Sequence, residues 1–226
     1  SADSIASPNT TLNAIVAEAF CEAADILEKA DDFDIAVHDL IKKYLTEHQR
    51  IIFNGNGYSE EWVEEAARRG LPNIKSMVEA SETLTTEKSI KLFEKFGIFT
   101  KAELESREEV LYETYSKTIN IESNTMVEMV QKDLLPSVMS YIEEIASTAS
   151  LKASVVPGIT CESETALITK LSELQDAMTK GLEKLKADTA KARATEDILE
   201  NAKLYQSEVL EDMEELRKSA DEAETL

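Results

Sequence analysis

The chain has 226 residues, with 45 aspartates and glutamates against 24 lysines and arginines, and a formal net charge of −21 at pH 7. This charge repels a nucleic-acid backbone and an anionic membrane surface, so neither is an expected partner. Only 6 glycines and 4 prolines are present, and the abundance of Ala, Glu, Lys and Leu predicts long helices rather than sheets.

The first two predicted helices are amphipathic. Apolar residues recur with a helical period and predict one helix over residues 10–29 and a second over residues 33–48. Asp31, Asp32 and Asp34 at the start of the second helix suit the positive end of a helix dipole. They do not form a calcium loop, because no glycine or closing glutamate follows at the required offsets.

The segment RIIFNGNGYSEEW, residues 50–62, raises the question of a phosphate-binding loop, since Gly55 and Gly57 precede a helix. Such a loop directs backbone N–H groups at an anion, usually with a lysine. Here glutamates open the next helix, and both the lysine and the third glycine of the known fingerprints are missing. Because Asn and Gly tolerate positive φ, we predict a turn rather than a nucleotide site.

Local start and stop signals define the next elements. Ser59 is expected to cap a short helix that ends before Gly70, and Thr85 or Thr86 a further helix that ends before Gly97. TKAE, residues 100–103, is a capping box, in which the threonine and glutamate side chains each satisfy a free backbone N–H.

Charged pairs on the short helix after Ser59 are predicted to be structural. Glu64 with Arg68, and Glu65 with Arg69, stand at the four-residue spacing that supports a solvated helix face. We therefore interpret them as exposed ion pairs rather than as a catalytic pair of carboxylates.

A long helical stretch over residues 104–130 follows, with a break at residues 120–124 as an alternative. Pro136 lacks an N–H and predicts a kink or a new helix start. Residues 154–160, SVVPGIT, are predicted to form a linker.

The last part of the chain carries two stripes of mostly apolar residues with steps of three and four. The first is Leu167, Leu171, Leu174, Met178, Gly181 and Leu185, and the second is Ile198, Ala202, Tyr205 and Val209. We predict an antiparallel helical hairpin over residues 162–226, because Thr195, Glu196 and Asp197 make a good new helix start. A single unbroken helix is the alternative, since no Gly or Pro separates the stripes. The predicted fold class is all-α, a multi-helix bundle followed by this long hairpin.

No catalytic, cofactor-binding or metal-binding residue is predicted in this chain. The only histidines, His38 and His48, have no cysteine nearby in sequence to complete a zinc site. Cys21 and Cys161 are expected to be reduced thiols in a cytoplasmic protein. The aromatic residues at helical spacings are expected to lie in the core: Trp62, Tyr112, Tyr115 and Tyr141.

The two ends suggest a piece of a longer protein. The segment SADSIASPNT has neither a starting methionine nor the basic and apolar regions of a signal peptide. No apolar run approaches the roughly 20 residues of a membrane span. The final helix also reaches Leu226 without a stop signal.

Several strings resemble the carboxy-terminal part of type III glutamine synthetases. They follow one another in the same order and cover nearly the whole chain: SIASPNTTLNAIVAE, RIIFNGNGYSEEWVEEAARRGLPN, KLFEKFGIFTKAELESR, YSKTINIES, TEDILENAKLY and MEELRKSADEAE. The resemblance is weaker over residues 146–194, where composition accounts for most of the match.

This resemblance implies a parent enzyme that joins glutamate and ammonia with ATP and Mg²⁺ or Mn²⁺. It places the catalytic residues before Ser1, so the chain itself is expected to be inactive, without a cofactor, and structural. Its expected partners are other parts of the parent chain and neighbouring subunits of a homo-oligomeric ring. The expected division is a helical part of the catalytic domain over residues 1–153, a linker over 154–161 and the hairpin over 162–226.

Two other functions are left open by the residues themselves. One is an independent acidic helical scaffold or adaptor that binds a basic partner. The other is a nucleotide-binding enzyme centred on Gly55 and Gly57.

Overall fold

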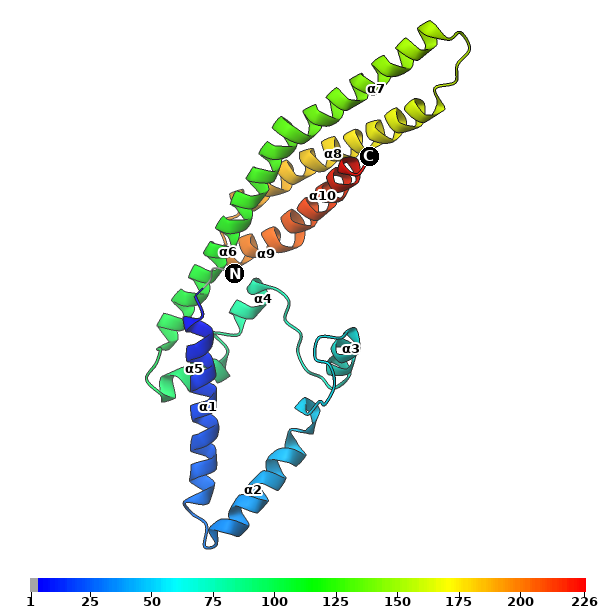
Figure 1. Cartoon of the computed structure of the whole chain (residues 1–226). Helices are drawn as coiled ribbons and strands as arrows, with labels where there is room; N and C mark the ends of the chain where they lie inside the picture. Colours follow the sequence, from blue (N-terminus) through cyan, green and yellow to red (C-terminus); the bar gives the residue numbers. More distant parts are fainter. Residues whose placement is uncertain (1–3) are drawn as a thin grey trace. The chain divides into compact units, whose positions relative to one another are not determined.

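The computed structural model describes residues 4–226, and within this range it contains helices, turns and loops but no strand (Figure 1). The all-α prediction is therefore confirmed. The contacts divide the chain into two compact units, Ser1–Glu108 and Glu109–Leu226. The first three residues, part of the segment examined for a signal peptide, lie outside the described range.

The first unit contains short and medium helices joined by loops. They are α1 (Ala6–Leu27), α2 (Phe33–Glu47), the 3₁₀ turn η1 (Gln49–Ile51), α3 (Glu60–Arg68), α4 (Met77–Glu82), α5 (Glu87–Lys95) and the beginning of α6 (Lys101–Met129). The predicted first helix starts at Ala6 rather than at residue 10. Pro8 fits in its first turn because the N–H groups there need no helical partner. Helix α4 was not predicted, although Ser76 caps it by accepting a hydrogen bond from Glu79 N at 3.1 Å.

The predicted capping box is formed at the start of α6. Thr100 N donates to the Glu103 carboxylate at 2.7 Å, and Glu103 N donates back to Thr100 Oγ1 at 3.3 Å. The Thr100 backbone N–H is the main reason why the pKa of Glu103 is lowered, and the Thr100 hydroxyl adds to the effect. Gly70 and Gly97 also end their helices as predicted, with φ of +69° and +61°.

Of the predicted caps at Thr86 and Ser59, the structure forms the first but not the second. Thr86 caps α5, with Thr86 Oγ1 accepting from Ser89 N at 3.3 Å. Ser59 occupies the cap position of α3, but its hydroxyl donates to Asn56 O at 2.9 Å instead of bonding the helix.

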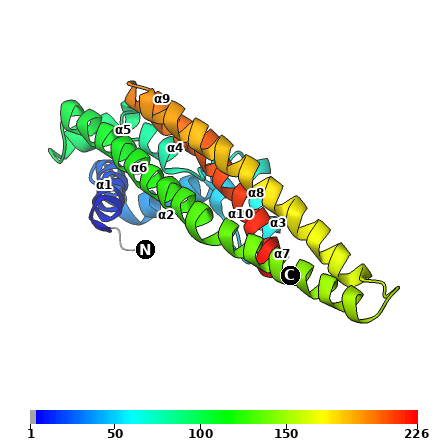
Figure 2. The same ribbon diagram turned by 90° about the horizontal axis from the view of Figure 1, so that it is seen from above.

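The second unit is built from long helices. After the rest of α6 come the π-helical turn η2 (Val130–Leu134), α7 (Leu135–Val155), α8 (Glu162–Ala194), α9 (Ile198–Leu204), the π-helical turn η3 (Tyr205–Val209) and α10 (Leu210–Glu224). Figures 1 and 2 show α10 returning alongside α8. The predicted antiparallel hairpin is confirmed, and the single long helix is excluded.

The hairpin turn lies where the sequence predicted a new helix. Asp197 caps α9 by accepting from Glu200 N at 2.8 Å. Asn201 Nδ2 donates at 2.6 Å to Ala192 O, a carbonyl at the end of α8 that also accepts from Thr195 N at 3.1 Å.

The alternative break at residues 120–124 is wrong, because α6 continues to Met129. The Asn120 side chain is instead used in tertiary contacts: its Oδ1 accepts from Arg193 Nη2 at 3.0 Å and from Tyr205 OH at 3.1 Å. The new start predicted at Pro136 takes the form of the π-helical turn that precedes α7.

The main core lies in the second unit. Its buried side chains come from α6, η2, α8, η3 and α10 and include Ile119, Val130, Met178, Leu182, Leu185, Val209 and Leu216. Gly181 brings α8 close to α10, because a Cβ at this position would lie 3.3 Å from Leu216 Cδ1. The first unit has a smaller core cluster made of Ala14, Phe93 and Leu104.

Helix α7 ends at Val155, and the connection to α8 turns at Gly158 with φ +83°. A non-helical connection therefore occupies most of the predicted linker. The division into domains over residues 1–153, 154–161 and 162–226 stays a prediction.

Candidate interaction surfaces

Helices α1 and α2 carry most of their large apolar side chains on the surface of the first unit. Phe20 is 72% exposed, whereas Ala14 is the buried residue of α1 and Leu40 that of α2. We call the exposed set the α1–α2 apolar surface: Leu12, Ile15, Val16, Phe20, Ile26, Phe33, Ile35, Ile41 and Leu45. Apolar exposure on this scale is typical of a surface that another protein segment covers.

A second exposed apolar group lies at the end of the α7–α8 pair, which we call the α7–α8 tip. It consists of Leu151, Val155, Val156 and Ile159, and Val155 is 78% exposed. Figures 1 and 2 show this connection at the end of the two helices. The sequence predicted this segment only as a linker. The three apolar residues Val155, Val156 and Ile159 within it could have indicated an exposed apolar surface.

The residue 50–62 segment is a turn, but the reason for its glycines differs from the prediction. Neither Gly55 nor Gly57 has a positive φ. A Cβ on Gly55 would lie 2.3 Å from Phe53 Cζ, so this glycine allows the close approach of an aromatic ring. The Phe53 ring stacks on Trp62 of α3, with ring centroids 4.1 Å apart. The turn itself is closed by Ser59 N donating to Asn56 O at 3.3 Å.

Arg69 joins this turn to α3. It donates to Ile52 O at 2.8 Å and to Glu65 at 2.5 Å, and its guanidinium carbon lies 5.6 Å from the centre of the Trp62 ring. The predicted Glu65–Arg69 pair is thus formed. For Arg68 the structure shows a contact with Glu65 rather than the predicted one with Glu64. Arg69 first, and Arg68 second, lower the pKa of Glu65.

Replacing Arg69 with lysine is expected to loosen the turn, because lysine lacks the planar guanidinium that reaches a carbonyl, a carboxylate and an aromatic face together. Trp62 is the single tryptophan of the chain, so acrylamide quenching of its fluorescence reports on this site alone. We expect stronger quenching in Arg69→Lys than in the unmodified chain. Arg68→Lys, at a side chain that is largely exposed, is the control. Equal quenching in all three proteins would show that Arg69 does not hold the turn.

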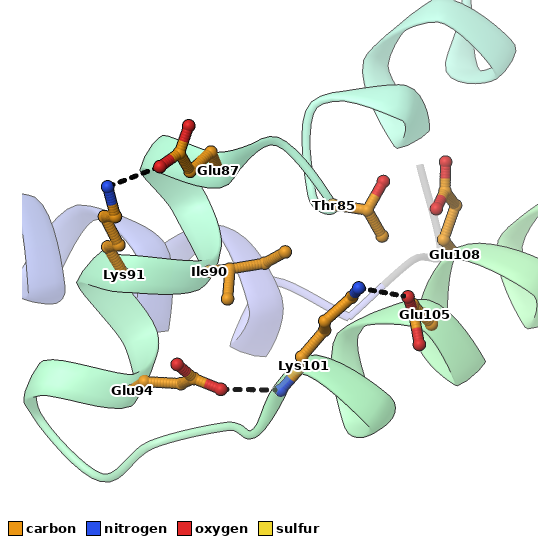
Figure 3. A pocket seen from close by; sticks show the side chains of 8 residues that line it. All are labelled: Thr85, Glu87, Ile90, Lys91, Glu94, Lys101, Glu105 and Glu108. Carbon is orange, nitrogen blue, oxygen red and sulfur yellow. Dashed lines mark hydrogen bonds and ion pairs between the residues drawn. The ribbon is translucent and has the colours of Figure 1, made fainter.

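The chain has a surface pocket of about 570 Å³ between α5 and the start of α6 (Figure 3). Its charged side chains are largely engaged with each other: Lys91 pairs with Glu87 at 2.5 Å and Lys101 with Glu105 at 3.5 Å. Glu94 accepts from the backbone N of Lys101 at 3.2 Å. These contacts describe a solvated helix junction.

The remaining sequence candidates are separate from one another. Over residues 4–226 no group of three potential metal ligands comes together, and no helix is long and apolar enough to cross a membrane. His38 and His48 are exposed, and Cys21 and Cys161 are free thiols. The prediction that no catalytic, cofactor or metal residue lies in this chain stays a prediction.

The four aromatic residues expected in the core differ in how far they are buried. Tyr112 is buried, as predicted. Trp62 and Tyr115 are half-buried, and Tyr141 is 41% exposed, so the prediction is wrong for Tyr141. On α7 the helical spacing of Tyr141 gives no information about whether a neighbour covers it.

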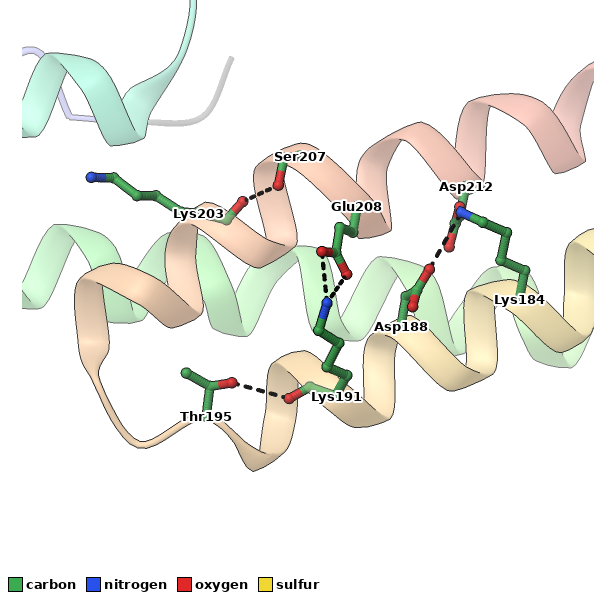
Figure 4. Close-up of polar contacts among 8 residues, drawn as sticks. All are labelled: Lys184, Asp188, Lys191, Thr195, Lys203, Ser207, Glu208 and Asp212. Atoms are coloured by element: carbon green, nitrogen blue, oxygen red, sulfur yellow. Dashed lines mark hydrogen bonds and ion pairs between the residues drawn. The ribbon is translucent and has the colours of Figure 1, made fainter.

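Ionic contacts connect the two helical arms of the hairpin (Figure 4). Lys191 of α8 binds both carboxylate oxygens of Glu208 at 2.7 Å. Lys184 of α8 lies 3.3 Å from Asp188 Oδ2 and forms an ion pair with Asp212 of α10. Together with the apolar stripes, these contacts set the register of α8 against η3 and α10.

The amino-acid sequence is similar to those of known proteins over most of its length. Residues 36–152 match the family described as the glutamine synthetase C-terminal domain. The chain is 45% identical to a glutamine synthetase of Butyrivibrio fibrisolvens, over 87% of this chain and 28% of that protein. It is 34% identical to a type-3 glutamine synthetase of Dictyostelium discoideum, over 96% of this chain and 30% of that protein. The chain thus spans less than a third of the length of these relatives.

Proposed function

Because the chain belongs to the glutamine synthetase family through its C-terminal domain, we propose that it is the helical C-terminal region of a type III enzyme. The enzyme would be an ATP-dependent ligase that joins glutamate and ammonia in the cytoplasm. ATP and Mg²⁺ or Mn²⁺ would bind to parts of the protein outside these 226 residues. The carboxylates that hold the metal ions, and the arginines that neutralise the transferred phosphoryl group, would belong to those parts.

The role proposed for this chain is architectural. The observation that carries it is the α1–α2 apolar surface, where α1 and α2 each bury a single residue and expose several large apolar ones. The cost of leaving such side chains in water supports a covering partner. We assign that cover to other parts of the parent polypeptide, and the α7–α8 tip to a neighbouring subunit of a homo-oligomer.

The assembly role is tested in the full-length parent enzyme by measuring its mass after removal of residues 162–226. We expect smaller assemblies; an unchanged mass would reject the role. Val155→Glu is a finer test, because it places a charge on the α7–α8 tip. Ser150→Glu, an exposed position near the same end of α7, is its matched control.

The expected inactivity of the isolated chain needs a separate experiment. Purified protein with residues 1–226 is assayed for glutamine formation with glutamate, ammonia, ATP and magnesium, and for ATP binding by calorimetry. We expect neither. Heat released on titration with ATP and magnesium would favour the nucleotide-binding alternative at Gly55 and Gly57.

A further inference from the structure

Two aspartates from neighbouring helices meet around one lysine at the contact between α8 and α10 (Figure 4). Asp212 of α10 is only 3% exposed. Its Oδ1 pairs with Lys184 of α8, while its Oδ2 is buried and receives no hydrogen bond from the described residues. An ionised carboxylate oxygen that is buried without a donor is unfavourable, so this arrangement requires a further source of hydrogen bonding.

Asp188 of α8 is the neighbour that can supply it. The Asp188 and Asp212 carboxyls contact the same ammonium group: Asp188 Oδ2 lies 3.3 Å from Lys184 Nζ, and Asp212 Oδ1 pairs with the same nitrogen. Two ionised carboxylates have only acceptors, and a hydrogen bond between them therefore needs a proton on one of them. With one shared proton, the three groups carry one negative and one positive charge, and the buried oxygen gains a donor.

We propose that Asp188 and Asp212 share one proton when α10 is packed on α8, and that loss of this proton loosens α10, which makes the hairpin contact sensitive to pH. The inference concerns the hairpin itself and does not depend on the activity of the parent enzyme.

The charged surroundings support this assignment. The groups that act directly on Asp212 are Lys184 and Asp188, both from α8. Burial is the main cause that raises the pKa of Asp212; the Lys184 hydrogen bond lowers it, and Asp188 raises it again. Lys184 stays charged, because its bond to Asp212 raises its own pKa.

Other charged residues lie beside this group rather than between its members. Lys180, Glu211 and Glu215 line the adjoining open pocket of about 440 Å³, through which a proton can exchange with solvent. Glu208 of η3 is engaged with Lys191.

The sign of the effect follows from the raised pKa of Asp212. A carboxyl that binds its proton more tightly in the folded than in the unfolded chain stabilises the fold fully below its unfolded pKa. This contribution is lost as the pH rises through the higher folded pKa. The proposal therefore predicts that α10 opens more readily from α8 at neutral pH than at mildly acidic pH.

Hydrogen exchange of the α10 amides in the 226-residue chain tests the proposal. It compares the unmodified protein with Asp212→Asn from about pH 4, near the ordinary pKa of an aspartate, to about pH 8. The asparagine amide can donate to Asp188 at every pH, as the shared proton does. After correction for intrinsic exchange, we expect α10 protection in the unmodified chain to fall, relative to Asp212→Asn, as the pH rises. The total fall is about tenfold for each unit by which folding raises the Asp212 pKa.

Two further variants make the result specific. Asp188→Asn should behave like Asp212→Asn, because its amide can donate to the Asp212 carboxylate at every pH; it also decides the question if Asp212→Asn does not fold. Glu183→Gln removes an exposed carboxylate from α8 and should follow the unmodified chain. Salt near 0.5 M suppresses the general repulsion among surface charges. A protection ratio that stays constant over this pH range in the folded aspartate variants would overturn the proposal.

Discussion

Replacing Leu185 with alanine is expected to lower the free energy of unfolding of the second unit by about 2–5 kcal/mol. Leu185 of α8 is 0% exposed and belongs to the cluster that includes Val209 of η3 and Leu216 of α10. The substitution removes buried methyl groups and leaves a cavity that the surrounding helices fill only in part. Urea unfolding followed by circular dichroism measures the change.

Leu151→Ala is the matched control for this prediction. It makes the same chemical change on the second unit, but the Leu151 side chain is 65% exposed. Its expected effect is within about 0.5 kcal/mol, as for most surface substitutions. If Leu185→Ala and Leu151→Ala had the same effect, the buried face of α8 would be assigned to the wrong side of the helix.

Replacing Gly181 with leucine is expected to separate α10 from α8. The position faces Leu216, with the Cα and Cδ1 atoms of Leu216 at 3.6 Å and 3.3 Å from a Cβ built on Gly181. Leu216 is 1% exposed and so has little room to move aside. Overpacking of this kind costs about 1–3 kcal/mol or more, which exceeds the gain of about 1 kcal/mol from replacing glycine in a helix.

Thermal unfolding and hydrogen exchange of α10 measure this loss of contact. Ala187→Leu adds a bulky side chain at an exposed position of the same helix and should leave both unchanged. A melting temperature of Gly181→Leu at or above that of the unmodified chain would contradict the close approach of the two helices.

The two units show different relations between sequence and structure. In the second unit, the periodic apolar residues predicted which side of α8 is buried, and Leu171, Leu174, Met178 and Leu185 are all in the core. In the first unit, the same periodicity correctly predicted α1 and α2 as helices, yet their apolar residues remain largely exposed. Periodicity identifies a face that favours burial, but it does not identify the segment that covers it.

The residue 50–62 turn illustrates the same limit at a finer scale. Asn and Gly indicated a change in chain direction, and a turn is present at Asn56–Ser59. The stack of Phe53 on Trp62 and the bonds from Arg69 to backbone carbonyls join residues up to 19 positions apart. These contacts depend on the path of the whole loop, which composition does not specify.

The sequence by itself determined the all-α class, a cap at Thr85 or Thr86, the capping box at Thr100, the stops at Gly70 and Gly97, a new helix start near Asp197, and the family. These features rest on interactions within about four residues of the chain, or on long ordered strings. Only the tertiary structure decided that Asp212 is buried and shares Lys184 with Asp188. It also decided that Asn120 of the continuous helix α6 bonds Arg193 and Tyr205, and that Gly55 makes room for an aromatic ring. The physical reason is that burial and side-chain pairing depend on which distant segments pack together, and many local patterns are compatible with more than one such packing.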